Sequence, residues 1–170
     1  MTIHSTDPFA TPDDRRSPVR QWRGRLPAPV TLWTATGPAG PAGLTVSSLM
    51  VADGAPGRLL GLVDEESELW EALRGSGRFA VAVLAPGHRQ LADRFAGLMP
   101  APGGPFRGYE WTETPYGPVP ADVPGWAGCR LDASRTHGWA LLVEATIEQI
   151  EIDGSGDPLV HFRGRYRGLV

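Results

Sequence analysis

The chain has 170 residues, of which 41% are hydrophobic and 21% are charged, and its formal net charge is −3. A chain of this length most often forms one domain with a substantial core, and its mild acidity argues against a general nucleic-acid or anionic-membrane partner. The single cysteine, Cys129, excludes an internal disulfide and a cysteine-rich metal site.

All 16 of the lysine and arginine residues are arginines, and the chain has no asparagine. The absence of lysine excludes Schiff-base chemistry, a lysine general base and a Walker-type phosphate loop. A bound phosphate must therefore be held by arginine, hydroxyl groups or backbone amides. The longest apolar runs, such as residues 79–85, are too short to span a bilayer. Because the N-terminus lacks an apolar signal core, we expect a cytoplasmic protein.

Residues 1–20 are polar and carry three prolines, which predicts a flexible N-terminal arm ahead of a folded domain over residues 21–170. We expect the arm to end in a short helical turn near Gln21. A first strand is predicted over residues 30–36, where branched and larger side chains alternate.

Residues 37–43 are rich in glycine and proline and predict a hairpin loop, so that the run opening at Leu44 forms a second, antiparallel strand. This run is apolar but contains the hydroxyls of Thr45, Ser47 and Ser48, and each buried hydroxyl must find a partner or cost free energy. Hydroxyls and exposed amides at a strand end suit a polar, planar ligand or a phosphate. The alternative is a barrel strand whose hydroxyls bond to neighbouring backbone.

A strand over residues 58–63 precedes a helix that we expect Asp64 to cap and that should run to Leu73. Gly75 and Gly77 should end this helix, and its apolar stripe should be buried.

A fully apolar strand is predicted over residues 79–84, and Pro86 followed by glycine opens a second helix. The apolar residues of this helix fall at helical spacing and indicate core rather than a binding site: Leu91, Phe95, Leu98 and Met99. Residues 100–128 then form a long loop with scattered aromatic residues, which is usually packed down, often as a lid or a partner contact.

Three strands are expected after this loop, over residues 129–131, 139–152 and 159–166, with a turn at residues 154–156 before the last. The longest of them should place alternate residues on one buried face: Trp139, Leu141, Val143, Ala145 and Ile147. The whole pattern predicts a mostly β fold, a small antiparallel barrel with two or more helices outside.

Five pieces of the chain, in matching order and spacing, resemble the flavin reductase-like family, whose fold is the FMN-binding split barrel. They are residues 30–35 (Val-Thr-Leu-Trp-Thr-Ala), residues 43–49 (Gly-Leu-Thr-Val-Ser-Ser-Leu), Ser67, residues 77–84 with 91–96, and the closing residues 158–166. The resemblance covers the chain from about Trp22 to Leu169 and implies a small antiparallel split β-barrel with flanking helices.

The resemblance also implies a homodimeric flavoprotein that transfers hydride from NADH or NADPH to FMN, or to FAD. Such reductases commonly supply reduced flavin to a partner monooxygenase. The positions that would line the isoalloxazine in this sequence are Thr45, Val46, Ser47, Ser48 and Leu49. Hydroxyls and amides there would meet the polar edge of the ring.

Two further positions match the family. Ser67 corresponds to a serine near the flavin phosphate, close to the start of a predicted helix where an anion is favourable. His137 lies near the family's histidine before the long strand, where it could face nicotinamide or flavin, and it is the one catalytic candidate.

The sequence departs from the family around the phosphate position. The threonine that follows the serine by two places is Leu69, and a flanking basic residue is replaced by the acidic residues 64–66. Negative charge beside a phosphate is unfavourable unless an arginine such as Arg94 or Arg58 offsets it. We count Arg94 among the candidates for binding the flavin.

Other interpretations remain open. The chain could be a non-catalytic flavin-binding or flavin-free barrel that acts as a carrier, sensor or assembly partner, or an enzyme that uses another cofactor such as a deazaflavin. A hydrolase pairing of a serine with His137 lacks a Gly-x-Ser-x-Gly elbow, and the other histidines lack the spacing of metal ligands, so no metal is expected. The arginines at 163, 165 and 167 could hold a phosphate, although a solvated or dimer-facing stripe is the commoner explanation.

Overall fold

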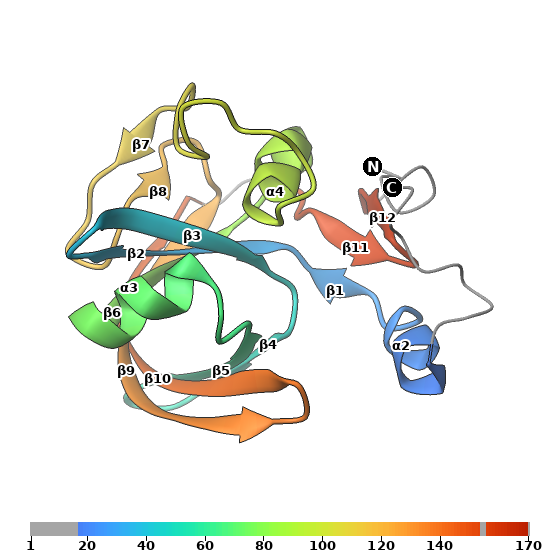
Figure 1. Cartoon of the computed structure of the whole chain (residues 1–170), viewed down its shortest axis with the longest axis horizontal. Helices are drawn as coiled ribbons and strands as arrows, with labels where there is room; N and C mark the ends of the chain where they lie inside the picture. The colour runs from blue at the N-terminus through green and yellow to red at the C-terminus, as the bar shows by residue number, and fades with distance from the viewer. Residues whose placement is uncertain (1–16, 154–155, 170) are drawn as a thin grey trace.

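The structure is a computed structural model that describes residues 17–153 and 156–169 (Figure 1). Most of the predicted arm, residues 1–16, and two residues of the predicted turn at 154–156 lie outside the described residues. The expected helical turn is present as α2 (Pro18–Arg23). Ser17 caps it by accepting a hydrogen bond from the Arg20 backbone N–H, and Pro18 occupies its first turn, where no N–H is needed.

A seven-stranded, fully antiparallel sheet forms most of the molecule. Its strands are β2 (Thr31–Gly37), β3 (Gly40–Val46), β4 (Leu49–Ala52), β5 (Arg58–Val63), β6 (Arg78–Val83), β9 (Gly125–His137) and β10 (Ala140–Ile152). They are arranged in the order β3-β2-β6-β9-β10-β5-β4, and Figure 1 shows the sheet curling strongly around its core. The edge strands β3 and β4 are not paired with each other, so the barrel is split, as predicted.

The predicted second strand is wrong in one respect, because the chain forms two strands there. The hairpin turn occupies only residues 38–39, and β3 already begins at Gly40, whose φ of 105° is accessible to glycine. At Val46 the chain leaves one edge of the sheet, and at Leu49 it enters the other. The two intervening serines belong to neither strand.

The interior of the curved sheet is built around two stacked aromatic rings. Trp33 and Phe79 are fully buried, and their ring centroids lie 4.8 Å apart. Gly61 of β5 passes directly over the Trp33 indole, where a Cβ would overlap the ring. Large side chains from one strand therefore require a glycine on the opposite one.

Helix α3 (Glu68–Ser76) closes one end of this core with the buried residues Leu69 and Leu73. Its N-cap is Ser67 rather than the expected Asp64, and its hydroxyl accepts a hydrogen bond from the Trp70 N–H at 3.2 Å. Such caps stabilise a protein by about 1 kcal/mol. The helix continues through Gly75 and ends at Gly77, which has left-handed φ.

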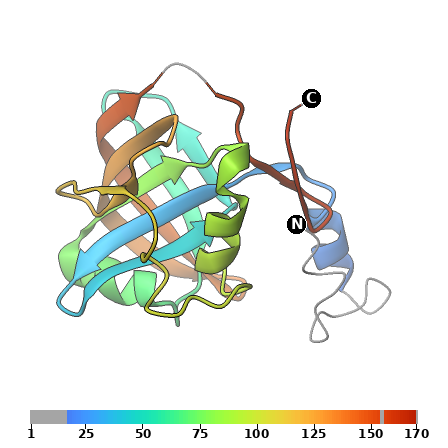
Figure 2. The ribbon, with the colours of Figure 1, turned by 90° about the horizontal axis from the view of Figure 1, so that it is seen from above.

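Helix α4 (Arg89–Phe95), preceded by the 3-10 turn η2 (Pro86–His88), covers the outer face of β2 and β3 (Figure 2). The predicted core residues Leu91 and Phe95 are buried against Leu32, whereas Leu98 and Met99 lie beyond the helix and are only partly buried. The long loop packs down as expected, with Phe106, Tyr109 and Trp111 against this outer cluster. It contains the short pair β7 (Trp111–Thr112) and β8 (Val119–Pro120).

The end of the chain differs from the prediction of one final strand. It forms a hairpin of β11 (Val160–Phe162) and β12 (Arg165–Arg167), because Arg163 and Gly164 both adopt positive φ. With β1 (Ala28–Pro29) this hairpin makes a three-stranded sheet, which lies with α2 to one side of the barrel (Figure 1).

Strand β10 confirms the predicted alternation over Leu141, Val143 and Ala145, which are buried, and Ile147 packs partly against them. The expectation for Trp139 is wrong: its side chain is fully exposed, because it belongs to the turn between β9 and β10. Within the described residues, no helix combines the length and apolarity that crossing a bilayer requires.

Candidate functional site

Ser47 and Ser48 form the junction between the two edge strands, and we refer to them as the serine junction. The Ser48 carbonyl accepts a hydrogen bond from the Leu62 N–H at 2.9 Å. Among residues 17–153 and 156–169, neither hydroxyl and neither backbone N–H of the two serines has a hydrogen-bond partner. The junction therefore presents four unused hydrogen-bond donors, and both residues are only partly buried.

Two hollows meet at the serine junction. The first, which we call the apolar cleft, has a volume of about 410 Å³ and is lined by leucines of β4, β5 and β10, with His137 at one side. The second, which we call the arginine hollow, has a volume of about 380 Å³ and is bordered by Arg20, His161 and Tyr166. Arg23 of α2 and the serine junction line both. These volumes are typical of small-molecule sites.

The apolar cleft has the character expected for a flat ring. Its walls include Leu49, Leu60, Leu62 and Leu142, so most of a bound surface would meet hydrocarbon. The donors of the serine junction lie at its edge, where they could satisfy ring carbonyls and nitrogens. Ser47, Ser48 and Leu49 therefore all line the apolar cleft, and their role in binding a flavin stays a prediction.

His137 is the last residue of β9 and lines the same cleft. The turn after it contains Gly138, whose φ is 62°, and this tight turn places the imidazole beside the cleft rather than in the core. Its side chain is exposed and forms no hydrogen bond with another described residue. Both ring nitrogens are therefore available to a ligand.

Thr45 and Val46 occupy the last positions of β3 and have structural partners. The Thr45 hydroxyl donates to the Ala92 carbonyl at 2.6 Å, which ties β3 to α4, although the residue also lines the arginine hollow. The Val46 side chain is buried in the core, and its carbonyl accepts a hydrogen bond from the Thr31 hydroxyl. The side chain of Val46 is therefore not accessible to a ligand in this structure.

Ser67 and Arg94 line neither hollow. The Ser67 hydroxyl donates to the Asp64 carbonyl at 2.6 Å while it caps α3. The Arg94 guanidinium donates to the Arg107 carbonyl at 2.7 Å and lies 5.2 Å from the Tyr109 ring centroid. Ser67 and Arg94 therefore lie apart from the two hollows at the serine junction, which the other candidates except Val46 line.

The site predicted from the sequence did not include α2 or the closing hairpin. Arg20 and Arg23 approach the serine junction only because the chain folds α2 against the hairpin, where the Arg163 N–H donates to the Gly24 carbonyl. Their spacing of three residues on a capped helix was the available signal.

The closing hairpin is fixed to the barrel by a buried hydrogen bond. The Tyr166 hydroxyl donates to Asp93 Oδ1 at 2.9 Å, and Asp93 is almost fully buried in α4. Burial, followed by this hydrogen bond and the charge of Asp93, raises the pKa of Tyr166 well above its ordinary value. Tyr166 consequently remains a neutral donor and holds one wall of the arginine hollow in place.

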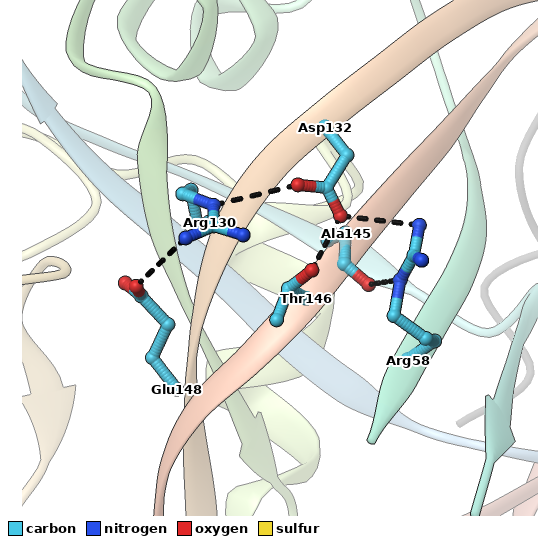
Figure 3. Close-up of polar contacts among 6 residues, drawn as sticks. All are labelled: Arg58, Arg130, Asp132, Ala145, Thr146 and Glu148. Atoms are coloured by element: carbon cyan, nitrogen blue, oxygen red, sulfur yellow. Dashed lines mark hydrogen bonds and ion pairs between the residues drawn. The ribbon is translucent and has the colours of Figure 1, made fainter. Parts of the chain in front are cut away.

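A second polar cluster lies on β5, β9 and β10 (Figure 3). Asp132 accepts hydrogen bonds from Thr146 and Arg130 and pairs with Arg58 at 3.2 Å, and Arg130 also reaches Glu148. The Thr146 hydrogen bond, together with the two guanidinium groups, lowers the pKa of Asp132. These charges are satisfied by one another, so the cluster supports the sheet and offers no open site.

Proteins similar to this chain are known. The family model described as "Flavin reductase like domain" matches residues 23–170. The FMN reductase (NADH) RutF of Variovorax paradoxus is 30% identical over 156 residues, which cover 91% of this chain and 86% of that protein. The 4-hydroxyphenylacetate 3-monooxygenase reductase component of Pseudomonas aeruginosa is 27% identical, with 92% of this chain and 94% of that protein covered.

A solved structure shows the same fold. The NADH:FAD oxidoreductase SgcE6 of Streptomyces globisporus superposes with a TM-score of 0.81 at 23% identity. The superposition covers 94% of this chain and 96% of that one. The curved sheet and its additional small sheet are therefore a known arrangement.

Proposed function

The chain belongs to the flavin reductase-like family, and we propose that it is an NADH-dependent flavin reductase that transfers hydride to FMN or FAD. The observation that carries this proposal is the serine junction, whose four unused donors border an apolar cleft. An isoalloxazine has apolar faces and a polar edge of carbonyls and nitrogens, so it fits both properties. The bound flavin supplies the redox chemistry, since it accepts hydride from a nicotinamide.

The residues of the chain have positioning roles in this proposal. The donors of Ser47 and Ser48 orient the ring edge, and Leu49 with the other leucines excludes water from its face. His137 lines the cleft, where it would contact the nicotinamide or the flavin. An imidazole can donate or accept a proton near neutral pH.

The same proposal includes a partner enzyme. The similar protein from Pseudomonas aeruginosa is named as the reductase component of a monooxygenase. We extend this to the present chain as a cytoplasmic supplier of reduced flavin to a monooxygenase.

We further propose a homodimer. Three apolar side chains on β4 and β5 are exposed: Met50 at 69%, Val51 at 64% and Leu60 at 38%. Met50 and Leu60 are cross-strand partners whose side chains share one face of the sheet, whereas Val51 points to the other face, and we call Met50 and Leu60 the β4 face. Strand β4 is also an edge of the sheet, so within the described part of the chain no strand pairs with its outer side. Contact with a second copy would cover both features.

The proposed function is tested by titrating the purified protein with FMN and then measuring NADH oxidation with and without flavin. We expect saturable binding and flavin-dependent turnover. The variant Ser48→Tyr should abolish both, because its ring would fill the junction, whereas Ser76→Tyr on the exposed end of α3 should change neither. Binding without turnover would identify a flavin carrier instead, and absence of binding to FMN and FAD would refute the proposal.

A further inference from the structure

Helix α2 and the closing hairpin form a basic lobe in a chain whose net charge is negative. Residues 17–29 and 156–169 contain six arginines and one carboxylate, Asp157. The arginines are Arg20, Arg23, Arg25, Arg163, Arg165 and Arg167. The two segments lie side by side, because β1 pairs with β11 and the Arg163 N–H donates to the Gly24 carbonyl. Positive charge is thus concentrated beside the serine junction.

Two of these arginines line the arginine hollow, and their guanidinium groups have no partner among the residues that the structure describes. Arg20 and Arg23 line it together with Ser47 and Ser48. Within the described part of the chain, neither guanidinium forms an ion pair or a hydrogen bond. Guanidinium groups, hydroxyls and free amides are the groups that bind phosphate oxygens. This chain has no lysine that could replace them.

The start of α3, where the family resemblance places the phosphate, has fewer groups that could bind an anion. The Ser67 hydroxyl is engaged in the capping of α3 and in a hydrogen bond to the Asp64 carbonyl. Three exposed carboxylates precede it at residues 64–66, and each would repel a phosphate. The Arg94 side chain points to the long loop, where the Arg107 carbonyl and the Tyr109 ring hold it.

We propose that the arginine hollow binds the phosphate-bearing tail of the flavin nucleotide, with Arg20 and Arg23 as its ligands. The proposal rests on the proposed function and extends it, since the ring would lie in the apolar cleft. The two hollows share the serine junction and Arg23, so one molecule can occupy both without leaving the protein surface. The phosphate site of this chain would then lie on α2 rather than at the start of α3.

The test compares flavins that differ only in the tail. Riboflavin, FMN and FAD are titrated, by flavin fluorescence, into the wild type, Arg20→Gln, Arg23→Gln and the control Arg165→Gln, which removes an arginine of the same lobe outside the hollow. We expect the wild type to prefer FMN to riboflavin. Each hollow variant should bind FMN about 10- to 100-fold more weakly, as expected for loss of a charge-assisted hydrogen bond, and bind riboflavin as before.

Unchanged riboflavin binding shows that a variant is folded. The proposal is wrong if both hollow variants keep the FMN preference while Ser67→Ala or Arg94→Gln loses it. It is also wrong if the hollow variants raise the KM for NADH without weakening FMN, because the hollow would then bind the pyrophosphate of the nicotinamide dinucleotide. A wild type that binds FMN and riboflavin equally tightly would exclude a phosphate site. Failure of the wild type to bind any flavin would instead refute the proposed function.

Discussion

His137 lines the apolar cleft and makes no contact that the fold requires. It ends β9, its side chain is exposed, and the residues described around it give it no hydrogen bond. Packing and stability therefore do not require an imidazole at this position. A polar group that the fold does not need, beside a cleft that holds a proposed cofactor, is a good candidate for a functional role.

We predict that His137→Ala lowers flavin-dependent NADH oxidation by about 10- to 100-fold, because positioned acid–base groups typically contribute at this level or above. The midpoint of thermal unfolding should not change. Steady-state kinetics and a melting curve check both expectations. The matched control is Arg135→Ala, which removes an exposed side chain of the same strand outside the cleft. Equal turnover in the two variants would assign no catalytic role to the histidine.

At the scale of single elements, the long strands β9 and β10 each contain a β-bulge that changes the direction of a carboxylate side chain. Glu144 pairs with Ala133 and Ala145 with Leu131, so Asp132 is the extra residue of β9, and a second shift makes Glu148 the extra residue of β10. A bulge redirects one side chain while the ladder continues. Both carboxylates consequently reach Arg130 on the same face (Figure 3).

The lowered pKa of Asp132 predicts the pH dependence of this cluster. A carboxylate whose pKa is lower in the folded state stabilises the protein above its unfolded-state pKa, here near 3.8. The stability advantage of the wild type over Asp132→Asn should therefore be complete above that pH. It should shrink as the pH falls through the lower pKa of the folded state.

Urea unfolding at about pH 3 and about pH 6 measures this difference. The control Asp153→Asn removes an exposed carboxylate that has no ion pair in the described chain, so its effect should be similar at both pH values. An Asp132→Asn effect that is equally independent of pH would show that the charge of Asp132 is not stabilised by its neighbours.

Several elements could be predicted because their signals are local. Strand β5 has the predicted bounds, 58–63, and the donors at Ser47 and Ser48 were recognisable as hydroxyls in an apolar run. The division of that run into β3 and β4 was not predictable, since both halves are apolar and only the curvature of the sheet separates them. Arg20 reaches the junction through long-range packing of α2; its spacing from Arg23 indicates a shared helix face but not which part of the barrel that face meets.

At the scale of the whole molecule, the exposed β4 face suggests how two chains would associate. Its side chains Met50 and Leu60 are cross-strand partners on neighbouring strands at one edge of the sheet. Apolar side chains and unpaired strand edges that stay in water favour aggregation, so proteins commonly cover them.

We predict that Met50→Asp converts the proposed homodimer to a monomer, because a carboxylate would be buried without a partner at the proposed interface. Light scattering coupled to size-exclusion chromatography measures the mass directly, and circular dichroism should show an unchanged fold. Ile152→Asp, which places the same charge at the exposed far end of β10, should leave the dimer intact. A wild type that is monomeric would refute the homodimer.

The split in the barrel has a mechanical consequence. The wall of the barrel is continuous through six strand pairings and open only between β3 and β4, which the serine junction joins covalently. A ligand that lies across this junction, with contacts to Thr45 on one side and Leu49 on the other, would bridge the opening between β3 and β4. Binding of the ligand would then make the whole barrel more rigid with little change in its shape. The rigidity of the barrel would therefore increase with the fraction of protein that has cofactor bound.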